Sequence, residues 1–483
     1  MKPVYGIDFG TTNCAVVEYN PGRAYHQFVK LGDYDTHPIP SLVSIDKLTQ
    51  KVECGREIWS EKLERQETGQ YLIVSSVKTA LDTDEVWRTP KRSWTAVEIA
   101  SQLFRFLCHH SAGQKTKRID QAVVTIPVGM SAGKRSAIRQ AAKTAGLEIL
   151  TFLSEPTAAF IAHAQNLAKY RYVVVFDWGG GTLDICVLQI QSGQVSELSA
   201  TRWDFAGDHI DRKLAEWIHL ECSRQLGVQR EFDTLDVLEK QTLLNTAEAK
   251  KRDLQEAEEV TFQIPYGGKF PKVKLTQKTF ESLIQPVVTE AVSLLFRCVE
   301  KAKIAPEEVG QLIVVGGSSK LELLRQELEE RWEFANVIYP PDAEWDIAKG
   351  AALIAANPGM YRTAESIGLI LSDSEYHPLL PAGTTIEESC FQIQFGLVED
   401  STTANFVFAN RTQNSLRPGQ IGNLSLPTLG FRDEILQMDT KINEDLVFEA
   451  IITNQAMRQH QKTFQYDRLK WVYQLPEIQE NYE

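Results

Sequence analysis

Two stretches of the chain share one pattern of apolar runs around a polar turn. Residues 4–19 (VYGIDFGTTNCAVVEY) hold two β-type runs separated by Gly, Thr and Asn, and residues 173–190 (VVVFDWGGGTLDICVLQI) repeat this design. Apolar runs of this length on both sides of such a turn predict β-hairpins with polar tips. Because the two units lie far apart in the chain, we expect an internal duplication that produces two similar lobes rather than a solenoid.

Helical periodicity fills most of the chain around these hairpins. A buried-type strand at 122–130 precedes a helix that is expected to begin after Ser131 and to end at Gly146, because Ser is a good N-cap and Gly a good C-cap. Pro156 indicates the first turn of another helix. Further helices are predicted at 234–257, 276–303 and 343–357, with a strand at 312–315 before a Gly-rich turn.

The pattern changes beyond residue 358. From Ser366 onward the chain shows short β-type runs broken by turn residues, with little helical periodicity. We therefore predict an α/β unit at residues 1–360, a linker at 361–365 and an all-β sandwich at 366–483.

Composition and charge exclude several classes of protein. The chain has 483 residues, 43% of them hydrophobic, and 51 basic against 64 acidic side chains give a net charge of −13. This composition indicates a soluble globular protein and argues against one that coats nucleic acid, since phosphate binding needs clustered Lys and Arg. The last 118 residues carry 8 basic and 16 acidic groups, a net −8, so the acidity is concentrated in the β-rich part.

Cysteine usage and hydropathy suggest a cytoplasmic location. The seven cysteines are scattered and never spaced as CxxC, which indicates neither a zinc site nor a disulfide framework. The N-terminus has no leader-like segment, and we find no apolar stretch of about 18 residues. We expect a cytoplasmic protein with neither nucleic acid nor membrane as a partner.

The two hairpin tips have the composition of phosphate-binding turns. Gly-rich and Thr-rich turns let backbone NH groups approach a phosphate closely, and an aspartate, Asp8 or Asp177, precedes each tip. Such carboxylates suit a hydrated Mg²⁺ ion that bridges phosphates. One tip alone could be an ordinary hairpin, but two in one chain favour a nucleotide site. The candidate ligands are Gly10, Thr11, Thr12 and Asn13 in the first turn and Gly179, Gly180, Gly181 and Thr182 in the second.

These motifs resemble a known family. DFGTTN, DWGGGTLD, SEPTAA, VVGGSSK and DIAKGAA, in this order over residues 4–357, are similar to the motifs of actin-like ATPases, in particular the seventy-kilodalton heat-shock chaperones of the DnaK type. The resemblance implies a two-lobed ATPase with duplicated ribonuclease-H-like cores, ATP or ADP with Mg²⁺ as cofactors, and slow hydrolysis. SIGLIL and HPLLPAGTTI also resemble the start of that family's substrate-binding β-sandwich, which implies unfolded or extended polypeptide clients.

The resemblance also assigns roles to individual residues. Lys78, which would otherwise be read as a surface lysine, is expected to orient the attacking water, and Glu155 to lie near the metal and the water as well as at a helix N-terminus. Asp8, Asp177 and Glu155 would hold Mg²⁺ mostly through water; Thr182 would touch the γ-phosphate, and Asp184 would support its turn. The remaining nucleotide contacts are assigned to Gly207, Asp208, Glu248, Lys251, Arg252, Gly316, Gly317, Ser318 and Asp342. Without the resemblance, the charged helix at 234–257 would be read as a solvated face.

The chain departs from the family pattern at several places. Pro127 and Arg135 keep the spacing of the family's proline switch, but PGMYRTAE (358–365) replaces its leucine-rich linker, so we expect little docking energy there. Thr151 and Ser154 replace residues that contact the J-domain cochaperone in bacterial members, which implies a non-standard cochaperone; a nucleotide exchange factor is also implied. The sequence ends near the end of the sandwich, so we expect no helical lid.

Three functions follow from this pattern. The first is an ATP-dependent, chaperone-like protein, which the retention of Lys78, Glu155, Asp8 and Asp177 favours. The second is a nucleotide-responsive regulatory or scaffold partner with little client cycling, which the altered linker and the expected lack of a lid favour. The third, a sugar or acetate kinase of the same superfamily, is disfavoured because the chain has a chaperone-type β module.

Overall fold

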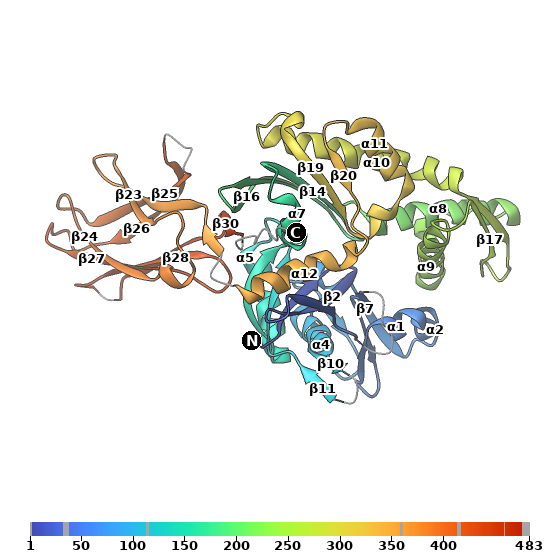
Figure 1. The fold of residues 1–483 in the computed structure, drawn as a ribbon. Coiled ribbons are helices and arrows are strands. Elements are labelled where there is room, and N and C mark those ends of the chain that lie inside the picture. Colours follow the sequence, from blue (N-terminus) through green and yellow to red (C-terminus); the bar gives the residue numbers. More distant parts are fainter. Residues whose placement is uncertain are drawn as a thin grey trace.

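Two sheets of the same topology form the centres of two lobes (Figure 1). The computed structural model describes residues 2–31, 38–112, 115–357, 361–412, 417–457 and 459–475. In each lobe a central strand pairs in parallel with a later strand and antiparallel with the next one along the chain. The strand orders are β13-β12-β1-β2-β3 in the first lobe and β20-β19-β14-β15-β16 in the second. The duplication predicted from the two hairpins is therefore present.

The strands of these sheets have the following bounds. The first lobe contains β1 (Val4–Phe9), β2 (Asn13–Asn20), β3 (Tyr25–Phe28), β4 (Ile39–Pro40), β12 (Gln121–Ile126) and β13 (Glu148–Ser154). The second contains β14 (Tyr172–Trp178), β15 (Leu183–Gln191), β16 (Gln194–Trp203), β19 (Val309–Val315) and β20 (Asn336–Ile338). Smaller sheets comprise β5 (Leu42–Asp46), β6 (Val52–Cys54) and β7 (Tyr71–Ser75); β8 (Val86–Arg88) and β9 (Ser93–Thr95); β10 (His109–Ala112) and β11 (Lys115–Arg118); and β17 (Glu259–Gln263) and β18 (Lys272–Thr276).

The helices begin and end close to the residues that the sequence indicates. The Ser131 hydroxyl accepts a hydrogen bond from the backbone of Lys134 at the start of α5, and Gly146 ends this helix with φ 81°. The principal helices are α4 (Ala96–Cys108), α5 (Ala132–Ala145), α6 (Glu155–Ala162), α8 (Gly207–Leu226), α9 (Val237–Asp253), α10 (Gln277–Lys301), α11 (Glu322–Arg331) and α12 (Ala343–Ala356). Shorter ones are α1 (Arg56–Ser60), α2 (Lys62–Glu67), α3 (Val77–Ala80) and α7 (Ala164–Leu167).

Contrary to the expectation from the sequence that no apolar stretch of this length is present, helix α10 is long and apolar enough to cross a membrane; it is the one such helix found among the described residues. Its buried face includes Ile284, Val288 and Leu295, which belong to the hydrophobic core of the second lobe. This packing is typical of a core helix.

Helix α12 runs between the two lobes and packs against α6 and β1 (Figure 1). Two glycines allow this approach, because a Cβ atom at Gly350 would lie 1.9 Å from the Ala158 carbonyl oxygen, and one at Gly6 would lie 2.2 Å from the Ala348 carbonyl oxygen. The lobes are therefore joined by two helices whose backbones are in direct contact.

The C-terminal part contains two four-stranded sheets with a common apolar core. Phe408 of one sheet stacks on Phe464 of the other with ring centroids 3.8 Å apart, and both sheets contribute to one cluster of buried residues. The first sheet has the order β23 (Tyr376–Leu380), β22 (Glu365–Ile370), β25 (Thr403–Thr412), β26 (Gly419–Pro427). The second has the order β24 (Phe391–Gly396), β27 (Ile435–Ile442), β28 (Phe448–Asn454), β29 (Gln461–Tyr466). We call these eight strands the β module.

The expectation of a weakly docked linker at 361–365 is wrong for its first residues. Tyr361–Thr363 form strand β21, and Trp471–Gln474, expected within the sandwich, form strand β30; both extend the sheet of the second lobe. Tyr361 is buried and stacks on Trp471 at 4.2 Å between ring centroids. The aromatic partner comes from a distant part of the chain, so the linker sequence alone could not indicate it. Residues 358–360 and 476–483, which the predicted boundaries also include, lie outside the described residues.

We expect Gly350→Ala to destabilise the protein, although Ala is normally the better helix former. The added methyl group would collide with the backbone of α6, and overpacking of this kind costs about 1–3 kcal/mol, or a Tm lower by about 2–4 °C per kcal/mol. Thermal unfolding measures the effect. Gly396→Ala is the control, because no atom of the described residues lies within 4 Å of the place that its methyl group would occupy; an equal Tm for both variants would contradict tight contact between α6 and α12.

Candidate functional site

The two glycine-rich turns meet each other between the lobes. A Cβ atom at Gly180 would lie 2.1 Å from Thr12 Oγ1, and one at Gly181 would lie 3.0 Å from Thr11 Cγ2. Each turn follows a central strand, β1 or β14, because the hairpin reverses where that strand ends. The structure therefore brings together two turns that are far apart in the sequence, and glycine is required where they touch.

Two further segments close around the second turn. The backbone NH groups of Gly207 and Asp208 donate to the carbonyl oxygens of Gly179 and Gly180, at 3.2 and 2.7 Å. The Ser318 hydroxyl donates to the Gly179 carbonyl at 3.0 Å. These contacts join the start of α8 and the loop after β19 to the turn, as expected for residues that share one ligand.

Gly316 and Gly317 shape the loop after β19. Gly316 has φ 85°, and a Cβ atom there would lie 2.6 Å from Asp177 Oδ1, so only glycine fits without strain. Around Gly317 the described residues leave open space instead. Gly316 thus allows the loop to pack against Asp177, and the space next to Gly317 is open.

Lys78 and Glu155 form a buried ion pair. Lys78 Nζ lies 2.8 Å from Glu155 Oε1, and the two side chains are 5% and 10% exposed. Lys78 comes from α3 and Glu155 from the first turn of α6, where the helix dipole favours a negative charge. Lys78 is therefore not a surface lysine, and Glu155 is both a helix-terminal residue and an ion-pair partner.

More carboxylates surround Lys78 than one ammonium group can neutralise. Desolvation and then the nearby Glu155 raise the pKa of Asp8 to about 7, although Lys78 and a 2.9 Å hydrogen bond from Thr125 lower it. Burial, followed by the charges of Glu155, Asp184 and Asp8, raises the pKa of Asp177 well above its usual value. Repulsion of this kind favours a bound cation.

Asp184 supports the second turn. It accepts a hydrogen bond of 2.9 Å from the Thr182 hydroxyl, and burial raises its pKa to about 6. Asp184 Oδ1 and Thr12 Oγ1 are buried and have no hydrogen-bond partner among the described residues. This set of groups fits a hydrated cation with phosphate groups, since it offers carboxylates, hydroxyls and the backbone of two glycine-rich turns in one place.

The described side chains do not form a group that could bind a metal ion directly. Within the part of the chain that the structure describes, no group of three His, Cys, Asp or Glu side chains could hold a metal ion. The expectation that Asp8, Asp177 and Glu155 reach Mg²⁺ mostly through water stays a prediction.

Helix α9 supplies a second group of charged residues. Lys251 Nζ lies 2.7 Å from Asp211 Oδ1 of α8, and Arg252 lies 2.7 Å from Glu248 Oε1. The Arg252 guanidinium also lies over the ring of Trp59, 5.1 Å from its centroid, which connects the second lobe to α1 of the first. These charges are part of specific contacts, so the reading of α9 as a merely solvated face is insufficient.

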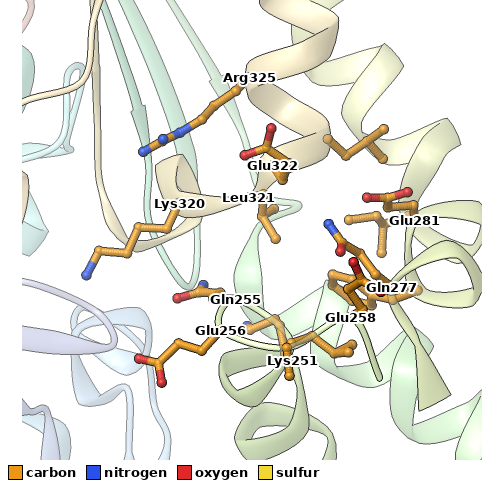
Figure 2. Close-up of a pocket in the computed structure, with 15 residues that line it drawn as sticks. Lys251, Gln255, Glu256, Glu258, Gln277, Glu281, Lys320, Leu321, Glu322 and Arg325 are labelled. Atoms are coloured by element: carbon orange, nitrogen blue, oxygen red, sulfur yellow. The ribbon is translucent and has the colours of Figure 1, made fainter. Parts of the chain in front are cut away.

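A cavity of about 510 Å³ adjoins α9 (Figure 2). It lies between the end of α9, the start of α10 and the segment 320–325, and its apolar lining includes Leu254, Phe280 and Leu321. Lys251, Gln255 and Lys320 provide polar groups at its margin (Figure 2). Most residues that line the cavity are polar or charged, among them Glu256, Glu258 and Arg325, so its apolar surface is limited to a few side chains.

Asp342 does not line this cavity. It is exposed at the start of α12, where its carbonyl oxygen accepts a hydrogen bond of 2.7 Å from the Trp345 NH group. From the same helix, Glu344 instead reaches Lys320, with Oε1 2.5 Å from Nζ. Glu344 could not be identified from the sequence, because three acidic residues occur at 342–346 and the sequence does not indicate which of them contacts Lys320.

Glu197 is another residue that the sequence analysis missed. It lies on β16 of the second lobe and accepts hydrogen bonds from the hydroxyls of Ser154 and Thr157, the latter at 2.6 Å. These hydroxyls flank Glu155 on both sides, so Glu197 connects the second lobe to the N-terminus of α6. No sequence signal indicates this contact, because it joins elements of different lobes.

The raised pKa of Asp8 predicts a pH-dependent stability. The folded protein keeps a proton on Asp8 up to about pH 7, whereas the unfolded chain loses it near pH 4. The associated stability is present below pH 4 and is lost as pH rises through 7. We expect the Tm of the nucleotide-free protein to fall from pH 5 to pH 8, and Asp8→Asn to remove at least about 1 kcal/mol of this dependence. Differential scanning calorimetry measures it, and the exposed Asp84→Asn should follow the wild type.

Comparison with known proteins gives one consistent result. A family model described as Hsp70 protein matches residues 48–359. Chaperone protein DnaK from Thermotoga petrophila and that from Thermotoga maritima are each 28% identical over 425 residues, which cover 83% of this chain and 69% of the relative. Chaperone protein dnaK from Trieres chinensis is 28% identical over 357 residues, 68% of this chain and 57% of the relative. The chain belongs to the Hsp70 family.

Proposed function

We propose that this protein binds and slowly hydrolyses ATP and couples its nucleotide state to the binding of extended or unfolded polypeptide. Membership of the Hsp70 family places it among ATP-dependent chaperones with an actin-like, two-lobed ATPase. The observation that carries the proposal for this chain is the contact between the two glycine-rich turns beside the buried Lys78–Glu155 pair. We also propose an ATPase unit up to residue 360, and we expect a cytoplasmic location.

The phosphate chain would lie between the two turns. Backbone NH groups of Gly10 to Asn13 and of Gly179 to Thr182 would donate to it, because glycine permits the close approach that these bonds need. Bound Mg²⁺ would supply positive charge that offsets the carboxylates and the phosphate oxygens. Asp8, Asp177 and Glu155 would hold its water molecules.

Lys78 would position the attacking water. Its ammonium group is fixed by Glu155 and is shielded from solvent, so a water bound to it would keep one orientation. Positioning and charge stabilisation, rather than covalent chemistry, dominate phosphoryl transfer. The Thr182 hydroxyl would turn from Asp184 to the γ-phosphate.

The cavity beside α9 would take the nucleoside. Leu254, Phe280 and Leu321 offer an apolar surface, and Lys251 and Lys320 offer cations at its margin. Glu248, Arg252, Gly316, Gly317 and Ser318 would complete the contacts to ribose and base. Gln255, where the family commonly has a smaller side chain, lies on the cavity wall (Figure 2).

The β module offers an exposed apolar surface for a client. Val398, Leu429 and Phe431 are 65%, 47% and 60% exposed. The two loops that carry them are joined by a hydrogen bond of 3.0 Å between Thr428 N and Thr402 O. Acidic residues lie in the same loops, and the last 118 residues carry a net −8. This surface suits extended peptides that combine apolar and basic residues.

An exchange factor and a non-standard J-domain-type cochaperone are further proposed partners.

Single-turnover ATP hydrolysis tests the enzymatic part. We expect Lys78→Ala to lower the rate by about 100-fold, since removal of one positioning or charge-stabilising group commonly has this effect. ATP affinity, measured by calorimetry, should change much less. Lys91→Ala, an exposed lysine of the same lobe, is the matched control.

Because Lys78→Ala leaves Glu155 buried without its partner, the variant could lose stability. The double variant Lys78→Met with Glu155→Gln removes both charges and should remain folded but inactive. If the wild type hydrolyses ATP no faster than these variants, it is not an ATPase. ATP binding without turnover, together with capture of one dedicated partner, would instead support the regulatory or scaffold function.

Peptide binding tests the client part. We expect Phe431→Ser to weaken the binding of a fluorescent Leu- and Lys-rich peptide by about tenfold, as about 1.4 kcal/mol of apolar contact is lost. The affinity of the wild type should also fall as salt rises, because charge attraction is screened. Fluorescence anisotropy measures both effects. Phe270→Ser, which removes an equally exposed phenylalanine of the second lobe, should leave binding unchanged; equal losses for both variants would contradict a client site on the β module.

A further inference from the structure

Strand β30 lies outside the two sheets of the β module, although it follows them in the sequence. It is inserted between β16 and β21 in the sheet of the second lobe (Figure 1). Tyr473 pairs with Val195 on one side and with Tyr361 on the other. The NH group of Leu475 donates to the Gly193 carbonyl at 2.7 Å. The last described strand is therefore an internal strand of an ATPase-lobe sheet.

Several side chains in and beside β30 are buried. Tyr473, Leu475 and Tyr361 are 4%, 6% and 5% exposed, and they belong to the same apolar cluster as Val195 of β16. Trp471 stacks on Tyr361 with an interplanar angle of 8°. The strand is held by packing as well as by backbone hydrogen bonds.

Helix α5 of the first lobe makes a second attachment to the β module. Arg135, which is buried, donates from Nε to the Asp445 carbonyl at 2.7 Å and from Nη2 to the Asp467 carbonyl at 3.1 Å. Arg139 Nε lies 2.9 Å from Asp445 Oδ1. Both lobes therefore contact the module, each through a different element.

We propose that β30 is a clamp that keeps the β module attached to the ATPase lobes in every nucleotide state. A module tied at one end by a linker could swing away from the lobes as the nucleotide changes. Here the strands before and after the module, β21 and β30, pair with each other, and β30 also pairs with β16. Release would require the loss of the β16–β30 pairing and of the packing around it.

The clamp also defines the route by which nucleotide state reaches the module. Glu197 follows directly after Ser196, the last residue of β16 that pairs with β30, and its carboxylate holds the hydroxyls on both sides of Glu155. The helix terminus that carries Glu155 is thus connected through hydrogen bonds to the part of β16 that pairs with β30. This inference concerns the coupling step of the proposed function, but its test does not require ATP hydrolysis.

Hydrogen exchange and small-angle scattering test the clamp. The NH group of Val195 points toward β30, because Gly193 two residues earlier bonds Leu475 and alternate residues of a strand point to the same neighbour. In the wild type we expect the amide of Val195 to remain protected, and the radius of gyration to stay the same, without nucleotide, with ADP and with ATP. In the double variant Trp471→Ser with Tyr473→Ser, exchange at Val195 should be at least about 100-fold faster, which corresponds to about 2.7 kcal/mol. Lys462→Ala, an exposed position of strand β29, should resemble the wild type. Expansion of the wild type in any nucleotide state would overturn the proposal.

A cross-link keeps the test decisive if the double variant fails to fold. Ser196 and Val472 are paired residues of antiparallel strands, and such neighbours lie within the range that a disulfide spans. In Ser196→Cys with Val472→Cys, oxidation should leave nucleotide affinity and any peptide-dependent change in ATP turnover unaltered. A loss of the peptide response on oxidation, restored by reduction, would show that β30 must leave the sheet. A protein without ATPase activity would still show the protected amide of Val195, so failure of the proposed function is distinguishable from failure of the clamp.

Discussion

The structure depends on an excess of buried negative charge around a single ammonium group. Lys78 is paired with Glu155, yet burial, and after it the negative charge of Glu155, raises the pKa values of Asp8, Asp177 and Asp184. We propose that a hydrated cation with its phosphates would offset this repulsion, so that ligand binding and the contact between the two turns would be favoured by the same interaction.

Local features of this site were predictable from the sequence, and long-range ones were not. The two turns, the caps of α5 and the duplicated topology follow from patterns within about 20 residues. Lys78 could be identified only through the order of family motifs, since nothing in VSSVKTAL indicates burial. Glu197 and Asp211 could not be identified, because each acts through a partner in another element.

The region around residue 361 shows why the prediction of a weak linker failed. That prediction considered only the apolar residues within the linker itself, which are few. The burial of Tyr361 comes from Trp471 and Tyr473, more than 100 residues later. Strand pairing is decided by such distant partners, so the docking energy of a segment cannot be read from its own composition. The Pro127–Arg135 spacing did indicate a connection between the two parts of the chain, because Arg135 contacts the β module.

The pairing of β21 with β30 places the segments directly before and after the β module side by side, with Tyr361 opposite Tyr473. In topological terms the module is an insertion within a sheet rather than an appendage at its end. Its two ends could be joined by a short turn, and the sheet of the second lobe would keep both edge strands. A different domain could be inserted at this position, because proteins tolerate the insertion of a domain whose two termini lie close together.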